Sequence, residues 1–171
     1  MVKKGCVVYF AHGKESGPWG TKIQALAEIA RSKGCSVESP DYSTTQDPQK
    51  RVEMLLALKP AAKKLILVGS SMGGYVSAVA SRTLKPRGLF LLAPAFYIKR
   101  YPEQNPRPAA AYTEIIHGWS DDVIPLANAI KYAGEYHVTL HIVNSDHRLA
   151  SALNQIGDLF SVFLDRCLLK P

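Results

Sequence analysis

The chain has 171 residues, of which 47% are hydrophobic and 20% charged, with a formal net charge of +7. This size and composition predict one soluble domain, residues 1–171, and no apolar run is long enough to span a membrane. Because the basic residues are scattered, with no stripe that alternates with aromatic residues, we expect no nucleic-acid partner, although the charge favours anionic small molecules.

Short apolar runs alternate with helical patterns along the whole chain. In chain order, the expected elements are a strand at Cys6–Ala11, a helix from Trp19 to Ala30, a strand at Ser36–Ser39, a helix from Pro48 to Lys59, a strand at Leu65–Val68, a helix from Met72 to Ala80, strands at Gly88–Leu92 and Tyr112–Ile116, a helix from Pro125 to Gly134, a strand at Val138–Val143 and a helix from Leu149 to Cys167.

This alternation predicts an α/β fold: a three-layer, doubly wound and mostly parallel six-stranded sheet with helices on both faces. Functional residues of such sheets lie beyond the carboxyl ends of the strands. One long irregular stretch, Ala93–Ala111, carries four prolines and is either a functional loop or a plain surface excursion.

The three cysteines, Cys6, Cys35 and Cys167, are odd in number and far apart in the sequence. They show neither the spacing of a zinc site nor that of a disulfide framework, so we expect a core without such staples. The apolar run Cys6–Ala11 is too short for a secretory signal. These features predict a cytoplasmic protein in a reducing compartment.

The most informative motif is Gly-x-Ser-x-Gly at residues 69–73, between an expected strand and an expected helix. This context makes Ser71 the candidate nucleophile, with Gly69 and Gly73 as the small neighbours that a sharp strand-to-helix turn requires. The first free N–H groups of the following helix would face a developing oxyanion.

Acidic and basic partners follow the next expected strands. Asp121 or Asp122 comes after the fifth strand, where it either orients a catalytic histidine or caps the following helix. His147 follows the sixth strand and is the natural general base, because imidazole is the side chain suited to accept and return a proton near neutral pH. We expect His137 and His141 to be structural, whereas His12 and His117 end strands and are candidates to line the site.

The chain order of serine, acid and histidine resembles that of the α/β hydrolase superfamily. The segment His117-Gly118-x-x-Asp121-x-x-Ile124-Pro125 looks like the acid-bearing turn of small bacterial esterases and dienelactone-hydrolase-like proteins. That resemblance selects Asp121 over Asp122. It also implies a small lidless member, since no cap domain follows the fourth strand and no antiparallel strands precede the first.

The first strand leads into His12-Gly13, which resembles the oxyanion loop of these hydrolases. The resemblance assigns the backbone amides of Met72 and Lys14 as oxyanion donors. The assignment of Met72 follows from the turn itself. For the second donor, the amides of Gly13 and Glu15 are the alternatives to Lys14, because a small shift of the loop would bring either one into its place.

The resemblance implies a serine hydrolase that cleaves short-chain carboxylic esters or thioesters through an acyl-enzyme on Ser71. Phe96, Tyr97 and Trp119 are the expected substrate-binding residues, helped by Tyr101 and Trp19, unless these aromatics are ordinary packing. We expect no cofactor and no metal, a small-molecule acyl substrate, no membrane partner, and a monomer or homodimer. The alternatives are a catalytically silent binding module, or a perhydrolase, amidase or acyltransferase with the same triad.

Overall fold

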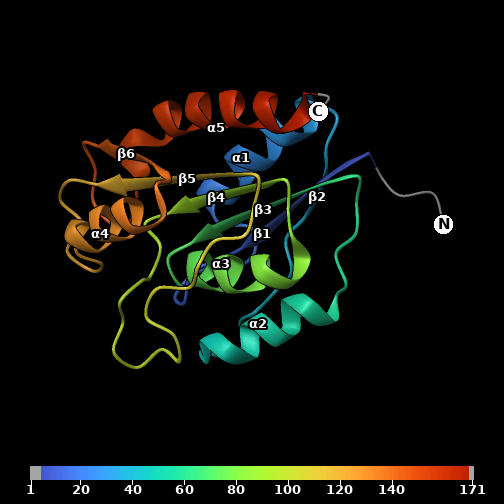
Figure 1. Ribbon diagram of the computed structural model, residues 1–171. Helices are drawn as coiled ribbons and strands as arrows, with labels where there is room; N and C mark the ends of the chain where they lie inside the picture. Colours follow the sequence, from blue (N-terminus) through green and yellow to red (C-terminus); the bar gives the residue numbers. More distant parts are fainter. Residues whose placement is uncertain (1–4, 170–171) are drawn as a thin grey trace.

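A sheet of six parallel strands forms the centre of the computed structural model, which describes residues 5–169 (Figure 1). This confirms the expected doubly wound architecture, with all neighbouring strands parallel. In their order across the sheet, the strands are β2 (Ser36–Glu38), β1 (Cys6–Ala11), β3 (Lys64–Ser70), β4 (Gly88–Leu92), β5 (Tyr112–Gly118) and β6 (Thr139–Val143).

Helices cover both faces of the sheet (Figure 1). On one face lie α1 (Thr21–Ser32) and α5 (Leu153–Leu168), and on the other lie α2 (Pro48–Ala57), α3 (Met72–Leu84) and α4 (Leu126–Tyr136). No helix within residues 5–169 combines the length and the apolar character needed to cross a membrane.

Strand β4 shows why the central strands read as unbroken apolar runs. Successive side chains of a strand point to opposite faces. Phe90 and Leu92 accordingly join the core beneath α1 and α5, whereas Leu89 and Leu91 join the core beneath α2, α3 and α4. All four are at most 1% exposed, and each such burial contributes about 1.5–3 kcal/mol.

The order of the strands places the site. After β1 the chain adds β2 on one side and then crosses to add β3 on the other, so the winding direction reverses between β1 and β3. Ligands of open parallel sheets bind in the crevice at this reversal, beyond the carboxyl ends of the strands. His12 and Ser71 directly follow β1 and β3, and therefore both lie at the crevice.

The last helix begins later than its sequence pattern predicts. Leu149 is fully buried but has a φ of 60°, and a short 3₁₀ turn at Ala150–Ala152 precedes α5. Asp146 Oδ1 accepts the backbone N–H groups of Arg148 and Leu149 at 2.9 and 3.2 Å. This side-chain-to-backbone turn competes with the helix and leaves His147 on a fixed loop.

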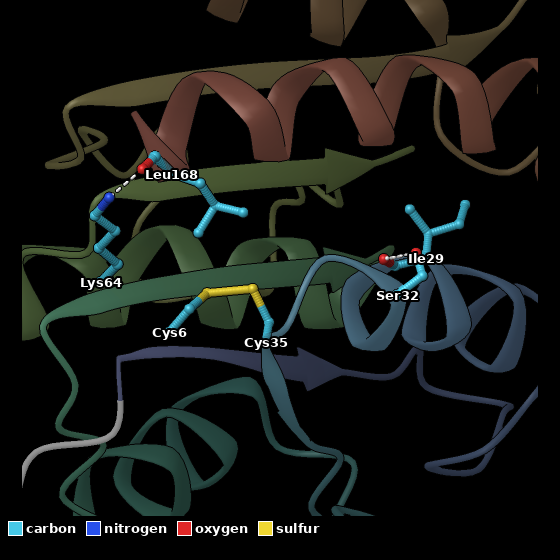
Figure 2. Close-up of a disulfide and its surroundings, with 6 residues drawn as sticks. All are labelled: Cys6, Ile29, Ser32, Cys35, Lys64 and Leu168. Atoms are coloured by element: carbon cyan, nitrogen blue, oxygen red, sulfur yellow. Dashed lines mark hydrogen bonds between the residues drawn. A yellow bond between two sulfur atoms is a disulfide. The ribbon is translucent and has the colours of Figure 1, made fainter. Parts of the chain in front are cut away.

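Two of the three cysteines are joined, which corrects the expectation of an unpaired set. Cys6 begins β1, Cys35 precedes β2, and the two form a disulfide with Cα atoms 4.7 Å apart (Figure 2). The distance between Cys6 and Cys35 along the sequence gave no sign of this pairing, because a parallel crossover brings the chain back beside its starting point. The buried Cys167 is free. The disulfide also removes the premise for expecting a reducing compartment.

Reduction of the Cys6–Cys35 disulfide should lower the free energy of unfolding by about 2–4 kcal/mol, because the bond restricts the unfolded chain. The two cysteines are 29 residues apart. Urea unfolding with and without dithiothreitol, followed by circular dichroism, measures the difference. The Cys35→Ser variant is the control and should not respond to the reductant; equal wild-type midpoints in both conditions would refute the prediction.

Candidate active site

Ser71 occupies a strained turn between β3 and α3. Its backbone has φ 53° and ψ −117°, a region that costs about 1–3 kcal/mol for a residue with a side chain. The Ser71 N–H donates to the carbonyl of Leu92 at 2.9 Å, and the Ser71 carbonyl accepts the N–H groups of Gly74 and Ala95 at 2.9 and 3.0 Å. The turn is thus fixed to the end of β4, which holds the hydroxyl at the sheet edge.

The glycine at position 73 lets α3 pack against the end of β1. A Cβ atom added to Gly73 would lie 1.9 Å from the carbonyl oxygen of Ala11. At Gly69, an added Cβ would lie 2.2 Å from the carbonyl oxygen of Gly73. Both obstacles are backbone atoms, so neither site accepts a side chain without displacement of the turn that carries Ser71.

Gly73→Ala should therefore lower the free energy of unfolding by about 3 kcal/mol or more. In a protein of this size, that corresponds to a fall of roughly 6 °C or more in Tm, measurable by differential scanning calorimetry. Gly134→Ala is the matched control, because an added Cβ meets nothing within 4 Å in the helix α4. It should stabilise the protein by about 0.5–1 kcal/mol; similar Tm values for the two variants would contradict the steric account.

Ser71, His147 and Asp121 form a continuous chain of hydrogen bonds. His147 Nε2 lies 3.1 Å from Ser71 Oγ, and His147 Nδ1 lies 2.8 Å from Asp121 Oδ2. The three residues follow β3, β6 and β5, so three loops converge at the carboxyl edge of the sheet. The distances allow the hydroxyl to donate to one imidazole nitrogen while the other donates to the carboxylate.

Asp121 is held more firmly than a surface aspartate. Its side chain is fully buried, and Oδ1 accepts the backbone N–H groups of Val123 and Ile124 at 2.9 and 2.8 Å. These bonds fix the carboxylate plane and leave Oδ2 for His147. Asp122, the other candidate from the sequence, is exposed.

His117 is a second imidazole contact of this carboxylate. Its Nε2 lies 3.1 Å from Asp121 Oδ2 and 2.9 Å from the carbonyl oxygen of Ile124. Because both neighbours are acceptors, Nε2 carries the proton and donates to them. Burial lowers the pKa of His117, which favours the neutral ring. The sequence made His117 a candidate to line the site, and the structure places it against Asp121.

The oxyanion loop lies against the nucleophile. A Cβ added to Gly13 would lie 3.6 Å from Ser71 Cβ, so the backbone after β1 packs beside the serine. Met72 is the first residue of α3, and its N–H has no acceptor within the helix. The Lys14 side chain is half exposed, and its ammonium lies 3.9 Å from a carboxylate oxygen of Glu15.

The three aromatics expected at the substrate site have different surroundings. Phe96 is fully buried and stacks on Tyr132 with ring centroids 4.0 Å apart, so that expectation is corrected: Phe96 fills the core. Tyr97 donates its hydroxyl to Glu135 at 3.0 Å, which fixes it against α4. Trp119 is 63% exposed and follows β5. Of the three, Trp119 has the most freely accessible ring.

Two of the remaining histidines, His12 and His141, have structural contacts. His12 is buried, and its Nε2 accepts the backbone N–H of Tyr42 at 2.9 Å. His141 Nε2 lies 2.7 Å from the buried carboxylate of Glu114, far along β5 from Asp121. Within residues 5–169, no group of three or more His, Cys, Asp or Glu side chains is arranged to hold a metal ion.

Comparison with known proteins agrees with this fold. A Xanthomonas campestris pv. campestris protein described as a candidate hydrolase of the alpha/beta superfamily is 32% identical, with a TM-score of 0.86, and the match covers 94% of this chain and 99% of that one. The model of the uncharacterised protein family UPF0227 matches residues 6–105. The chain therefore belongs to the α/β hydrolase superfamily and, in particular, to UPF0227.

More distant structures share the fold. Est1E from Butyrivibrio proteoclasticus is 16% identical with a TM-score of 0.80, covering 98% of this chain and 90% of that one. An α/β serine hydrolase without a lid from Xanthomonas campestris is 20% identical with a TM-score of 0.69, and the match covers 99% of this chain and 86% of that one. No curated protein matches the chain. As in the lidless relative, no cap domain is inserted among residues 5–169: the segment 93–111 between β4 and β5 holds no helix or strand.

Proposed function

We propose that the protein is a serine hydrolase that acts on carboxylic esters or thioesters through an acyl-enzyme on Ser71. The observation that carries the proposal is the hydrogen-bonded chain from Ser71 Oγ to His147 and on to the buried Asp121. A serine hydroxyl is a weak nucleophile unless a nearby base removes its proton. An imidazole within reach of the hydroxyl, and oriented by a carboxylate, supplies that base.

In the first half-reaction, Ser71 Oγ attacks the acyl carbonyl carbon while His147 Nε2 takes the hydroxyl proton. The carbonyl oxygen becomes an oxyanion, which accepts hydrogen bonds from the backbone amides of Met72 and Lys14. Asp121 stabilises the imidazolium that forms. Collapse of the intermediate breaks the bond to the alcohol or thiol, which leaves with the proton from His147, and Ser71 stays acylated.

In the second half-reaction, water attacks the acyl-enzyme and gives one proton to His147. The new tetrahedral intermediate collapses, the bond to Ser71 Oγ breaks, and the serine recovers its proton from His147. The products are one carboxylic acid and one alcohol or thiol. The N-terminus of α3 also favours negative charge near the oxyanion, since helix dipoles are positive at that end.

Short acyl groups suit this site best. The segment between β4 and β5 contributes no cap, Phe96 is withdrawn into the core, and Tyr97 is bonded to α4. Of the three aromatic residues expected to bind substrate, only Trp119 keeps an exposed ring, which leaves little apolar surface for a long acyl tail. We include in the proposal a small-molecule acyl substrate and a monomer or homodimer.

A chain-length series tests this preference. p-Nitrophenyl acetate, butyrate, octanoate and laurate, together with the matching thioesters, give kcat/KM as a function of acyl length. The highest values should occur for acetate or butyrate and should fall for octanoate and laurate. Higher kcat/KM for octanoate or laurate would overturn the proposed specificity.

A further inference from the structure

Arg51 is a buried arginine that faces backbone instead of a carboxylate. It lies on α2 and is 1% exposed. Its Nε donates to the carbonyl of Thr45 at 2.9 Å, and its Nη1 donates to the carbonyls of His12 and Gly13 at 3.2 and 3.1 Å. Among the described residues, no carboxylate oxygen lies within 4.0 Å of this guanidinium, and Nη2 has no hydrogen-bond partner.

This arrangement is unfavourable for stability taken alone. Burial of a cation without a paired anion is costly, and a buried donor without a partner adds to the cost. The bonds that Arg51 does make converge on the two residues that follow β1, His12 and Gly13, which begin the oxyanion loop. A function for Arg51 is therefore best sought in that loop.

The Gly13 carbonyl is held by two donors. Besides Arg51 Nη1, it accepts a hydrogen bond from His12 Nδ1 at 2.8 Å. His12 Nδ1 must carry the proton, because Nε2 already accepts the N–H of Tyr42. Arg51 on α2 and His12 in the loop thus fix the orientation of this carbonyl together.

A fixed Gly13 carbonyl also fixes the amide of Lys14, because both groups belong to one peptide plane. The structure contains no cis peptide bond among its described residues, so the Lys14 N–H points opposite to the Gly13 C=O. The N–H therefore points away from Arg51. A hydrogen bond from a guanidinium to the carbonyl further polarises the peptide, which makes its N–H a stronger donor.

We propose that Arg51 is a positioning residue for the oxyanion hole: it orients and polarises the Gly13–Lys14 peptide so that the Lys14 amide receives the developing oxyanion. This inference rests on the proposed hydrolase function. It favours Lys14 over Gly13 and Glu15 as the second donor. The Lys14 N–H belongs to the same peptide plane as the Gly13 carbonyl, which both Arg51 and His12 hold by hydrogen bonds.

The test compares Arg51→Met, Arg51→Lys and the control Arg31→Met in ester hydrolysis. Arg31 is a surface arginine bonded to Glu28 at 2.6 Å on α1, so its loss should leave kcat unchanged. Arg51→Met should lower kcat by about 10- to 100-fold, somewhat less than removal of an oxyanion donor outright. KM should change by less than about threefold, because the oxyanion forms only in the transition state.

Two further readouts separate positioning from a general structural role. The affinity of a trifluoromethyl ketone inhibitor should fall by the same factor as kcat, whereas the affinity of the carboxylate product should not change. Arg51→Lys keeps the charge but loses the planar fork, so it should recover at least about threefold of the activity that Arg51→Met loses. The midpoint of the acid limb of the pH profile should be the same in all variants.

An active wild type together with an Arg51→Met variant that keeps kcat within twofold would overturn the inference alone. A wild type that hydrolyses no ester would overturn the proposed function instead. If both Arg51 variants fail to fold, a crystal structure of the wild-type protein with the trifluoromethyl ketone decides. The hemiketal oxygen should lie on the amides of Met72 and Lys14, with the Gly13 carbonyl still on Arg51; binding to the amide of Gly13 or Glu15 would refute the inference.

Discussion

Ser71→Ala should lower kcat for p-nitrophenyl acetate by about 10⁴- to 10⁶-fold, because the acyl-enzyme cannot form without the hydroxyl oxygen. The remaining rate would come from binding and from the oxyanion donors alone. KM should change little, and the circular dichroism spectrum should match that of the wild type. The variant also relieves none of the backbone strain at the turn, since alanine keeps the Cβ atom.

Ser32→Ala is the matched control for this substitution. Ser32 lies at the end of α1, where its hydroxyl donates to the carbonyl of Ile29 at 2.8 Å (Figure 2). It is remote in the sequence from the three loops of the site, and its loss should leave kcat within a factor of two. A Ser71→Ala variant with more than about a tenth of the wild-type kcat would exclude Ser71 as the nucleophile.

Asp121→Asn should lower kcat by about 10³- to 10⁴-fold. The amide keeps the shape of the side chain but replaces one carboxylate oxygen with a donor, so the fixed N–H groups of Val123 and Ile124 will retain the remaining oxygen. The NH₂ group then faces His147 Nδ1, which forces the proton onto Nε2, where the serine proton must be accepted. Steady-state kinetics at neutral pH measures the loss.

Asp122→Asn supplies the control at the adjacent position. Asp122 is exposed, so its substitution should change kcat by less than about twofold. The pair of variants therefore separates a general effect of negative charge in this loop from the specific contact to His147. Equal losses in the two variants would contradict the assignment of Asp121 as the orienting acid.

The strands could be predicted from the sequence because buried parallel strands are short, apolar and separated by helices. β4 was expected at Gly88–Leu92 and has those bounds. The start of the last helix could not be predicted from periodicity, since Leu149 is apolar and correctly spaced yet lies in a turn held by Asp146. A side-chain-to-backbone bond of this kind leaves no trace in the hydrophobic pattern.

The candidate site was predictable where a local motif carries the information. Ser71 lies in a five-residue turn motif, and Asp121 lies four residues after His117 in a recognisable segment. Arg51 carried no such signal, because its contacts to His12 and Gly13 join residues almost forty positions apart on different elements. Phe96 shows the opposite error: a large aromatic on a long loop suggested a pocket wall, but it completes the core against α4.

The proposed hydrolase chemistry depends on an activated serine at position 71. Reaction with a fluorophosphonate probe, followed by tryptic digestion and mass spectrometry, tests that claim most directly, because only a serine with a positioned base reacts readily. We predict a single stoichiometric adduct on Ser71, and none in the His147→Ala variant. A folded wild-type protein that stays unmodified, or that carries the adduct on another residue, would contradict the account and favour a catalytically silent binding module.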